Sequence, residues 1–377
     1  MTESSRFLFD QDAHSRALTH ATQRALSTVF SVAFDRTGRF CVAATSLGSV
    51  HVFDLQPLMH ESFWHKSRRS SDVAPSHSFV AHRDTRIFAA AFASADVLLT
   101  AGDDGCLRAW SVPQLDSAAS PALLFQLSVP ARQFGSVAEL NGVAVDAATR
   151  HAFGAAGDSL LYAWDLETQQ SVRTFAGHTD YLHAVTLMPS GAPVTGAEDG
   201  TVRIWDCRAP DATTTLALPR SEATRQRAAY ISSVAVSGDG QWLAAGGGAN
   251  AAGLWHAPSQ QLVTVLPHAA AVGALRFVQP GDVGVASKAA GSDANSLGNV
   301  ASGSGGLVSG DIGSGTLSHW QLDGTLRMRV ATHASAVYSV VLNQPAQYRM
   351  LACAGLGPKI DLFFGNLAKR AFALKCS

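Results

Sequence analysis

Apolar and polar residues alternate in short segments that recur along the whole chain. Each segment has a small residue, then an apolar residue, one variable position and another apolar residue, which is typical of a half-buried β-strand. The seven copies span residues 31–34, 89–92, 142–145, 184–187, 233–236, 274–277 and 339–342. Recurrence of one strand pattern over the length of a chain indicates a repeat fold rather than a single large core.

A second apolar strand, a Gly or Asp turn and a third strand that ends on a large aromatic residue follow each copy. The aromatic residues are Phe53, Trp110, Trp164, Trp205, Trp255, Trp320 and Phe363. A four-stranded propeller blade takes about 40 to 45 residues when it has no insertions. We therefore predict an all-β, seven-bladed propeller over 28–376, with blades at about 28–82, 83–130, 136–178, 179–218, 228–267, 268–332 and 333–376.

The most regular copy is GHTDYLHAVTLMPSGAPVTGAEDGTVRIWD, residues 177–206, and it resembles the WD40 repeat family. The resemblance implies a structural tetrad, in which a turn Asp, a His, a Ser/Thr hydroxyl and a Trp indole hydrogen-bond in series within one blade. Such pairing satisfies polar groups that are costly to bury alone. Two tetrads are expected, one from His178, Thr195, Asp199 and Trp205 and the other from His82, Thr100, Asp104 and Trp110.

Three segments depart from the blade pattern. Residues 1–27 form an N-terminal extension in which residues 12–26 can make a helix, and residues 56–77 are a polar insertion in blade one. Residues 279–306 are rich in Gly, Ala and Ser, a composition that predicts a disordered insertion in blade six. The last blade can take its fourth strand from residues 370–374, but closure by an N-terminal strand such as residues 6–9 stays open.

Composition narrows the class of partner. The chain has 28 Lys and Arg against 29 Asp and Glu, so it lacks the basic excess that nucleic-acid binding draws on, and we expect RNA contact only indirectly. Five Cys without paired spacing indicate a reducing compartment, and no apolar run is long enough for a membrane span. The N-terminal residues have no apolar signal core.

Apparent catalytic motifs do not fit their chemistry. His60 and His65 are five residues apart, whereas a zinc-binding helix needs two His at i and i+4. The glycine clusters at 246–248 and 310–315 have no following helix and no Lys-Ser/Thr pair for phosphate binding. We expect no catalytic residue, no metal, no cofactor and no small-molecule substrate, and hence a protein that is not an enzyme.

Beyond the repeats, the chain resembles the THO complex subunit 6 family. The residues that carry the resemblance are GHTDYLHAV from 177, EDGTVRIWDCR from 198, WLAAGGGANAAGLWH from 242, HWQLDGTLRMRV from 319, LNQPA from 342 and IDLFFGNLAKRAFAL from 360. The match is good over blades three to seven and loose over blades one and two. It implies a nuclear scaffold that docks on coiled-coil THO subunits and acts in mRNA processing and export.

A second hypothesis comes from another functional class. Residues 194–208, VTGAEDGTVRIWDCR, also resemble the WDxR motif by which WD40 substrate receptors bind the adaptor of cullin-4 ubiquitin ligases. This resemblance implies that Asp206 and Arg208 face the adaptor. An enzyme with a site at the centre of the propeller is a third hypothesis, but no converging acids, bases or metal ligands support it.

Overall fold

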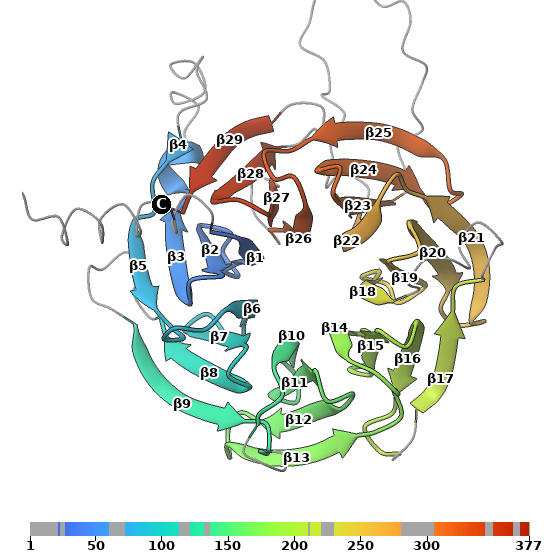
Figure 1. The fold of residues 1–377 in the computed structure, drawn as a ribbon, viewed down its shortest axis with the longest axis horizontal. Helices are drawn as coiled ribbons and strands as arrows, with labels where there is room; N and C mark the ends of the chain where they lie inside the picture. The colour runs from blue at the N-terminus through green and yellow to red at the C-terminus, as the bar shows by residue number, and fades with distance from the viewer. Residues whose placement is uncertain are drawn as a thin grey trace, which may run out of the picture.

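The computed structural model is a ring of seven sheets, each built on four antiparallel strands (Figure 1). The prediction of an all-β, seven-bladed propeller is therefore confirmed. No helix in the described part of the chain combines the length and apolar character needed to cross a membrane. The structure describes residue 22 and residues 27–59, 72–112, 121–131, 136–209, 212–219, 230–279, 305–343, 350–364 and 370–376.

The innermost strands of the seven blades surround the centre of the ring (Figure 1). They are β1 (Val29–Phe34), β6 (Ile87–Phe92), β10 (Leu140–Asp146), β14 (Leu182–Leu187), β18 (Ile231–Val236), β22 (Ala271–Val278) and β26 (Val337–Leu342). The second strands are β2 (Phe40–Thr45), β7 (Val97–Gly102), β11 (His151–Ala156), β15 (Pro193–Ala197), β19 (Trp242–Gly247), β23 (Gly306–Ile312) and β27 (Met350–Gly355).

Two further strands complete each blade outward. The third strands are β3 (Ser49–Asp54), β8 (Cys106–Ser111), β12 (Leu161–Asp165), β16 (Thr201–Trp205), β20 (Ala251–His256), β24 (Thr316–Gln321) and β28 (Lys359–Phe364). The outer strands are β5 (His77–Val80), β9 (Ala122–Ser128), β13 (Gln170–Phe175), β17 (Ala212–Ala217), β21 (Gln261–Pro267), β25 (Leu326–Ala331) and β29 (Arg370–Lys375). A short 3-10 helix, η1 (Gln56–Met59), follows β3.

Burial explains the sequence pattern. The second strands are buried almost without interruption because neighbouring blades cover both of their faces, whereas outer strands such as β9 and β21 are mostly exposed. The aromatic residue of each third strand is buried, from 0% exposed for Phe53 to 8% for Trp110. These side chains fill the space between successive blades, which is why one large ring recurs per repeat.

The ring closes between blade seven and blade one without exchanging an inner strand. All four strands of blade seven come from the C-terminal part of the chain, and β1 packs against β26 and β27. The backbone N–H of Val32 donates to Ser339 Oγ at 3.1 Å, just as Ala90 donates to Ser31 Oγ at 3.1 Å between blades one and two. The first and last blades are thus joined by the same kind of contact as their neighbours.

A fifth strand reinforces this junction. The two-residue strand β4 (Asp72–Val73) pairs in parallel with Ala373 and Leu374 of β29, at the outer edge of blade seven. We assigned these residues to blade one from the sequence, and this was wrong for β4. The outer edge of β29 has backbone N–H and C=O groups that no other strand of blade seven pairs. Strand β4, from the insertion of blade one, pairs with part of this edge.

Three predicted segments lie wholly or mainly outside the described residues. The helix over 12–26 does so apart from Thr22, and residues 6–9 do so entirely. The insertion over 279–306, which the composition predicts to be disordered, also lies outside them except for residues 279, 305 and 306. Its upper bound was wrong, because Gly306 belongs to β23 and pairs with Val278 and Gln321.

Candidate functional site

A series of hydrogen bonds links four side chains across blade four. Trp205 Nε1 on β16 donates to Thr195 Oγ1 on β15 at 2.9 Å, and that hydroxyl lies 2.8 Å from His178 Nε2. His178 Nδ1 lies 2.8 Å from Asp199 Oδ2 in the turn between these strands. His178 and Thr195 are buried, so each polar group finds its partner inside the protein. The network fixes the turn before β14 against two other strands of its blade.

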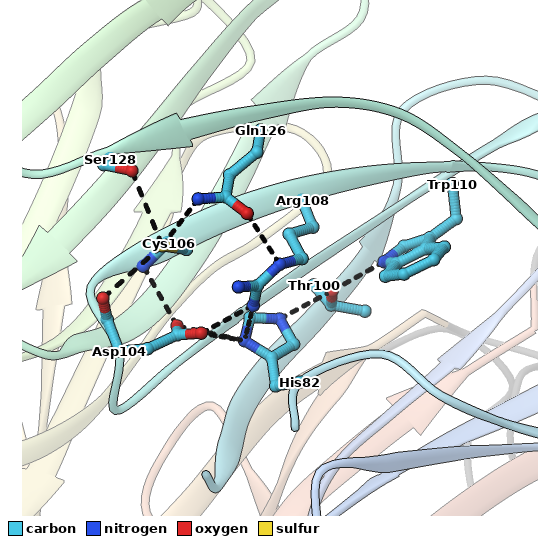
Figure 2. A network of polar contacts seen from close by, with 8 residues as sticks. All are labelled: His82, Thr100, Asp104, Cys106, Arg108, Trp110, Gln126 and Ser128. Carbon is cyan, nitrogen blue, oxygen red and sulfur yellow. Dashed lines mark hydrogen bonds and ion pairs between the residues drawn. The ribbon is translucent and has the colours of Figure 1, made fainter. Parts of the chain in front are cut away.

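Blade two contains a second network of the same design (Figure 2). Trp110 Nε1 donates to Thr100 Oγ1 at 3.0 Å, His82 Nε2 lies 2.9 Å from that hydroxyl, and His82 Nδ1 lies 3.0 Å from Asp104 Oδ1. The guanidinium of Arg108 also donates to Asp104, at 2.6 Å. The structure therefore brings together the four residues of each set that the sequence singled out.

The charge states agree with these hydrogen bonds. Burial disfavours the carboxylate of Asp104, but hydrogen bonds and charges from His82 and Arg108 outweigh it and lower its pKa to about 2. Burial lowers the pKa of His178, and the hydrogen bond and charge of Asp199 only partly offset this. At neutral pH His178 is therefore a neutral ring, which donates from Nδ1 to the acid and accepts at Nε2 from Thr195.

Blade seven has a variant network that the sequence analysis missed. His333 precedes β26, its backbone N–H donates to Asp361 Oδ2 at 2.7 Å, and its Nδ1 lies 2.5 Å from Asp361 Oδ1. Asp361 lies on β28 opposite Cys353 of β27. In the strand pairing of blade seven, Cys353 occupies the position that Thr195 has in blade four. The acid of blade seven thus lies on the third strand and not in the turn before it, so the residue spacing of a regular tetrad does not predict it.

Blade six shows another displacement. Trp320 Nε1 donates to Ser309 Oγ at 2.9 Å, and the His268 ring packs edge-on against Trp320 with centroids 5.3 Å apart. His268 Nδ1 lies 3.1 Å from Asp311 Oδ1, but out of line for a hydrogen bond. Asp311 is two residues after the hydroxyl residue instead of four. A His in the turn before a blade was the signal that could have led to both variants.

The networks of blades two, four, six and seven link strands within one blade through polar side chains. In the described ranges, no group of three or more His, Cys, Asp or Glu is arranged to hold a metal ion. His60 and His65 lie outside the described residues. The remaining blades carry Ala43, Gly154 and Ala245 at the register position of Thr195, so they have no tetrad hydroxyl. In the described residues, the polar side chains of these networks hold strands of a blade together.

The buried imidazole of His319 on β24 predicts a pH dependence of stability. Burial, with a smaller effect of Arg327, lowers the pKa of His319 from 6.5 to about 4. The unfolded chain binds a proton at His319 below pH 6.5, whereas the folded chain does so only near pH 4. The contribution of the neutral His319 ring to the free energy of unfolding is therefore complete above pH 6.5. We expect it to fall by on the order of 2 kcal/mol as pH drops from 6.5 to 4.

Chemical denaturation of wild type and His319→Gln at several pH values measures this effect. The variant should lose less stability than wild type over the same interval, because Gln does not titrate. Parallel curves for the two proteins between pH 6.5 and 4 would contradict the assignment.

Asp206 and Arg208 lie in the turn between β16 and β17. Arg208 donates from Nε and Nη2 to the two carboxylate oxygens of Asp206, each at 3.1 Å, and its side chain is 91% exposed. Hydrogen bonds from the side chain and backbone of Arg208 lower the pKa of Asp206. The pair is accessible, but each member already binds the other. Adaptor binding through these residues stays a prediction.

The surface carries exposed apolar side chains on some outer strands. They are Leu123 and Leu124 on β9, and Leu262, Val263 and Val265 on β21, with exposed fractions between 36% and 49%. Single exposed apolar residues are ordinary on a protein surface. Their grouping on two blade edges gives the rim two apolar stretches.

Comparisons with known proteins agree with the fold. The family model described as WD domain, G-beta repeat matches residues 74–111, 169–206 and 222–256. THO complex subunit 6 of Arabidopsis thaliana is 30% identical over 69% of this chain and 76% of its own length. The human protein of that name is 29% identical over 94% of both chains, and its Danio rerio homolog is 26% identical over 92% of this chain and 97% of its own. The chain therefore belongs to the THO complex subunit 6 family.

Proposed function

We propose that this protein is a WD40 scaffold subunit of a THO complex and acts in mRNA processing and nuclear mRNA export. The observation that carries the proposal is the extent of the similarity, because the match to human THO complex subunit 6 covers 94% of each chain. A likeness limited to the WD40 repeats would indicate the fold alone. This one also spans blades whose tetrads are incomplete, where the general repeat pattern constrains the sequence less.

The structure supports a scaffold role and not a catalytic one. His178 with Asp199 and His333 with Asp361 are paired within their blades, and outer strands such as β9 and β21 present apolar residues to solvent. A rigid disc with two faces and a rim can bind several proteins at once. The partners we propose are coiled-coil THO subunits, in the nucleus, with RNA reached through them because the net charge of −1 gives no basic excess.

Affinity purification of the tagged protein from nuclear extract tests this function. Coiled-coil THO subunits and an RNA helicase should be recovered together with it, and mass spectrometry identifies them. A tagged WD40 propeller from an unrelated complex is the control for binding to the fold in general. Recovery of no THO subunit above that control would rule the proposal out.

A further inference from the structure

The innermost strand of every blade has a β-bulge at the same place. The pairing with the second strand skips one residue in each blade, such as residue 30 between Val29 and Ser31. The skipped residues are Phe30, Phe88, Asn141, His183, Ser232, Gly273 and Tyr338. Because these strands surround the centre of the ring (Figure 1), the seven residues form a circle near the starts of the strands. A bulge frees a side chain from the alternation of its strand.

The circle is chemically uneven. Blades seven, one and two, which are neighbours, contribute three aromatic rings, and the other four blades contribute polar or small residues. The Phe30 and Phe88 centroids are 5.2 Å apart, and those of Phe30 and Tyr338 are 5.6 Å apart. We call these three residues the aromatic arc. All three remain partly exposed, so packing against one another does not remove them from water.

Two turns extend the apolar surface beside the arc. Leu47 is 39% exposed and Leu356 is 47% exposed. Backbone hydrogen bonds place both turns next to the starts of the inner strands, because Ser46 donates to the Thr28 carbonyl and Leu356 donates to the Ala336 carbonyl, each at 2.8 Å. Five apolar side chains from blades seven, one and two therefore share one face. Grouped exposed apolar residues of this kind mark interaction sites.

The same face is acidic over blades two to four. The turns after the second strands again lie beside the starts of the inner strands, because backbone hydrogen bonds join them. The backbone N–H groups of the turns donate to backbone carbonyls that precede the inner strands, in the pairs Asp103 to Arg86, Gly157 to Glu139 and Glu198 to Tyr181. Among the described residues of these loops outside the tetrads, the acids are Asp84, Asp103, Glu139, Asp158, Asp180 and Glu198, against Arg83 and Arg86 as bases. Arg86 is already paired with Asp103 at 2.6 Å. The described residues of these loops therefore carry more negative than positive charge.

The acidic loops and the aromatic arc lie close together. Arg86, whose ion pair belongs to the acidic loops, has its guanidinium 5.5 Å from the Phe88 ring centroid. On the other side, the His183 ring is 5.9 Å from Tyr230 and its Nε2 is 3.6 Å from Glu198. Burial raises the pKa of Tyr230, and the charges of Glu198 and Tyr338 add to this effect. A single bound segment can therefore contact both the aromatic arc and the acidic loops.

We propose that the aromatic arc, with Leu47 and Leu356, is a docking site for a short segment of a partner protein that carries aliphatic or aromatic side chains next to Lys or Arg. The apolar side chains of the segment pack on the arc, and its basic side chains lie over the acidic loops. Charge complementarity selects the orientation of the segment, while burial of the apolar side chains supplies most of the affinity. The inference rests on the proposed function in one respect, that the partner is a coiled-coil THO subunit.

Binding of purified coiled-coil THO subunits to three forms of this protein tests the site. The forms are wild type, the double variant Phe30→Ser/Tyr338→Ser, and the control Leu262→Ser/Val263→Ser on the rim strand β21. Circular dichroism and melting temperature establish that each form is folded. We expect the arc variant to bind at least tenfold more weakly than wild type, because aromatic contact residues commonly dominate an interface, and the rim control to bind as wild type does.

The outcomes separate the two proposals. Equal binding by wild type and the arc variant would overturn the docking site and leave the proposed function standing. Loss of binding by the rim control alone would have the same meaning. Failure of wild type itself to bind would overturn the proposed function, and the docking site with it. If the double variant does not fold, the single variant Tyr338→Ser replaces it and removes one partly exposed ring.

Photocrosslinking from Tyr338→p-benzoylphenylalanine in the assembled complex gives an independent measurement. Mass spectrometry should locate the crosslink in a segment with apolar residues next to Lys or Arg. A crosslink to an acidic segment, or none where the rim substitution Leu262→p-benzoylphenylalanine crosslinks, would contradict the proposed partner chemistry.

Discussion

Replacing Trp205 with alanine is expected to lower the free energy of unfolding by about 3–5 kcal/mol, the usual cost of removing a large aromatic side chain from a core. Trp205 is 1% exposed and packs against Phe175 and His178, with ring centroids 5.6 and 6.1 Å away. It shares a buried cluster with Phe153 and Leu182. The substitution therefore opens a cavity between blades three and four, and thermal or urea unfolding measures the loss.

The variant Trp205→Phe is the matched control for this prediction. It retains an aromatic ring between the blades but loses the N–H that donates to Thr195. We expect a smaller loss of stability than in Trp205→Ala. A melting temperature of Trp205→Ala within a degree of wild type would show that the ring does not support the junction between the two blades.

The variant Thr195→Val should cost about 2–5 kcal/mol, although the two side chains have nearly the same shape. The hydroxyl of Thr195 accepts from Trp205 Nε1 and donates to His178 Nε2, and both partners are buried. Valine leaves each without a hydrogen bond, and one buried unsatisfied group costs about 1–3 kcal/mol. Urea unfolding of the variant and of wild type at pH 7 measures the difference.

Thr195→Ser separates the hydroxyl from the methyl group. It retains both hydrogen bonds and loses only a methyl, so its loss of stability should be clearly below that of Thr195→Val. If the two variants are equally destabilised, packing of the methyl group, and not the network, accounts for the effect.

The repeat made most of the architecture predictable. An aromatic residue at the end of each third strand, such as Trp205 or Phe363, occurs once per blade because the space between blades needs a bulky side chain. The tetrad residues of blades two and four were predictable for a similar reason, since His, hydroxyl, acid and Trp fall at fixed spacing in both. Local patterns suffice where one blade contains the whole interaction.

Features that depend on contacts between distant segments were not predictable. The pairing of Asp72 and Val73 with β29 is one, because a two-residue strand in a polar insertion has no periodicity. The acid of blade seven is another, because Asp361 reaches His333 from the third strand across the sheet. The aromatic arc is a third. Phe30, Phe88 and Tyr338 look like ordinary strand residues until the bulges and the closed ring bring them together.

The junction between blades one and seven sets an order of events during synthesis. The ribosome makes β1 first and β29 last, yet Phe53 and Cys41 of blade one share a buried cluster with Ile360 and Leu374 of blade seven. Until those residues have folded, the open side of blade one exposes apolar surface to solvent. Partly folded forms of this protein that lack the junction are therefore expected to aggregate, or to bind a chaperone, until blade seven closes on blade one.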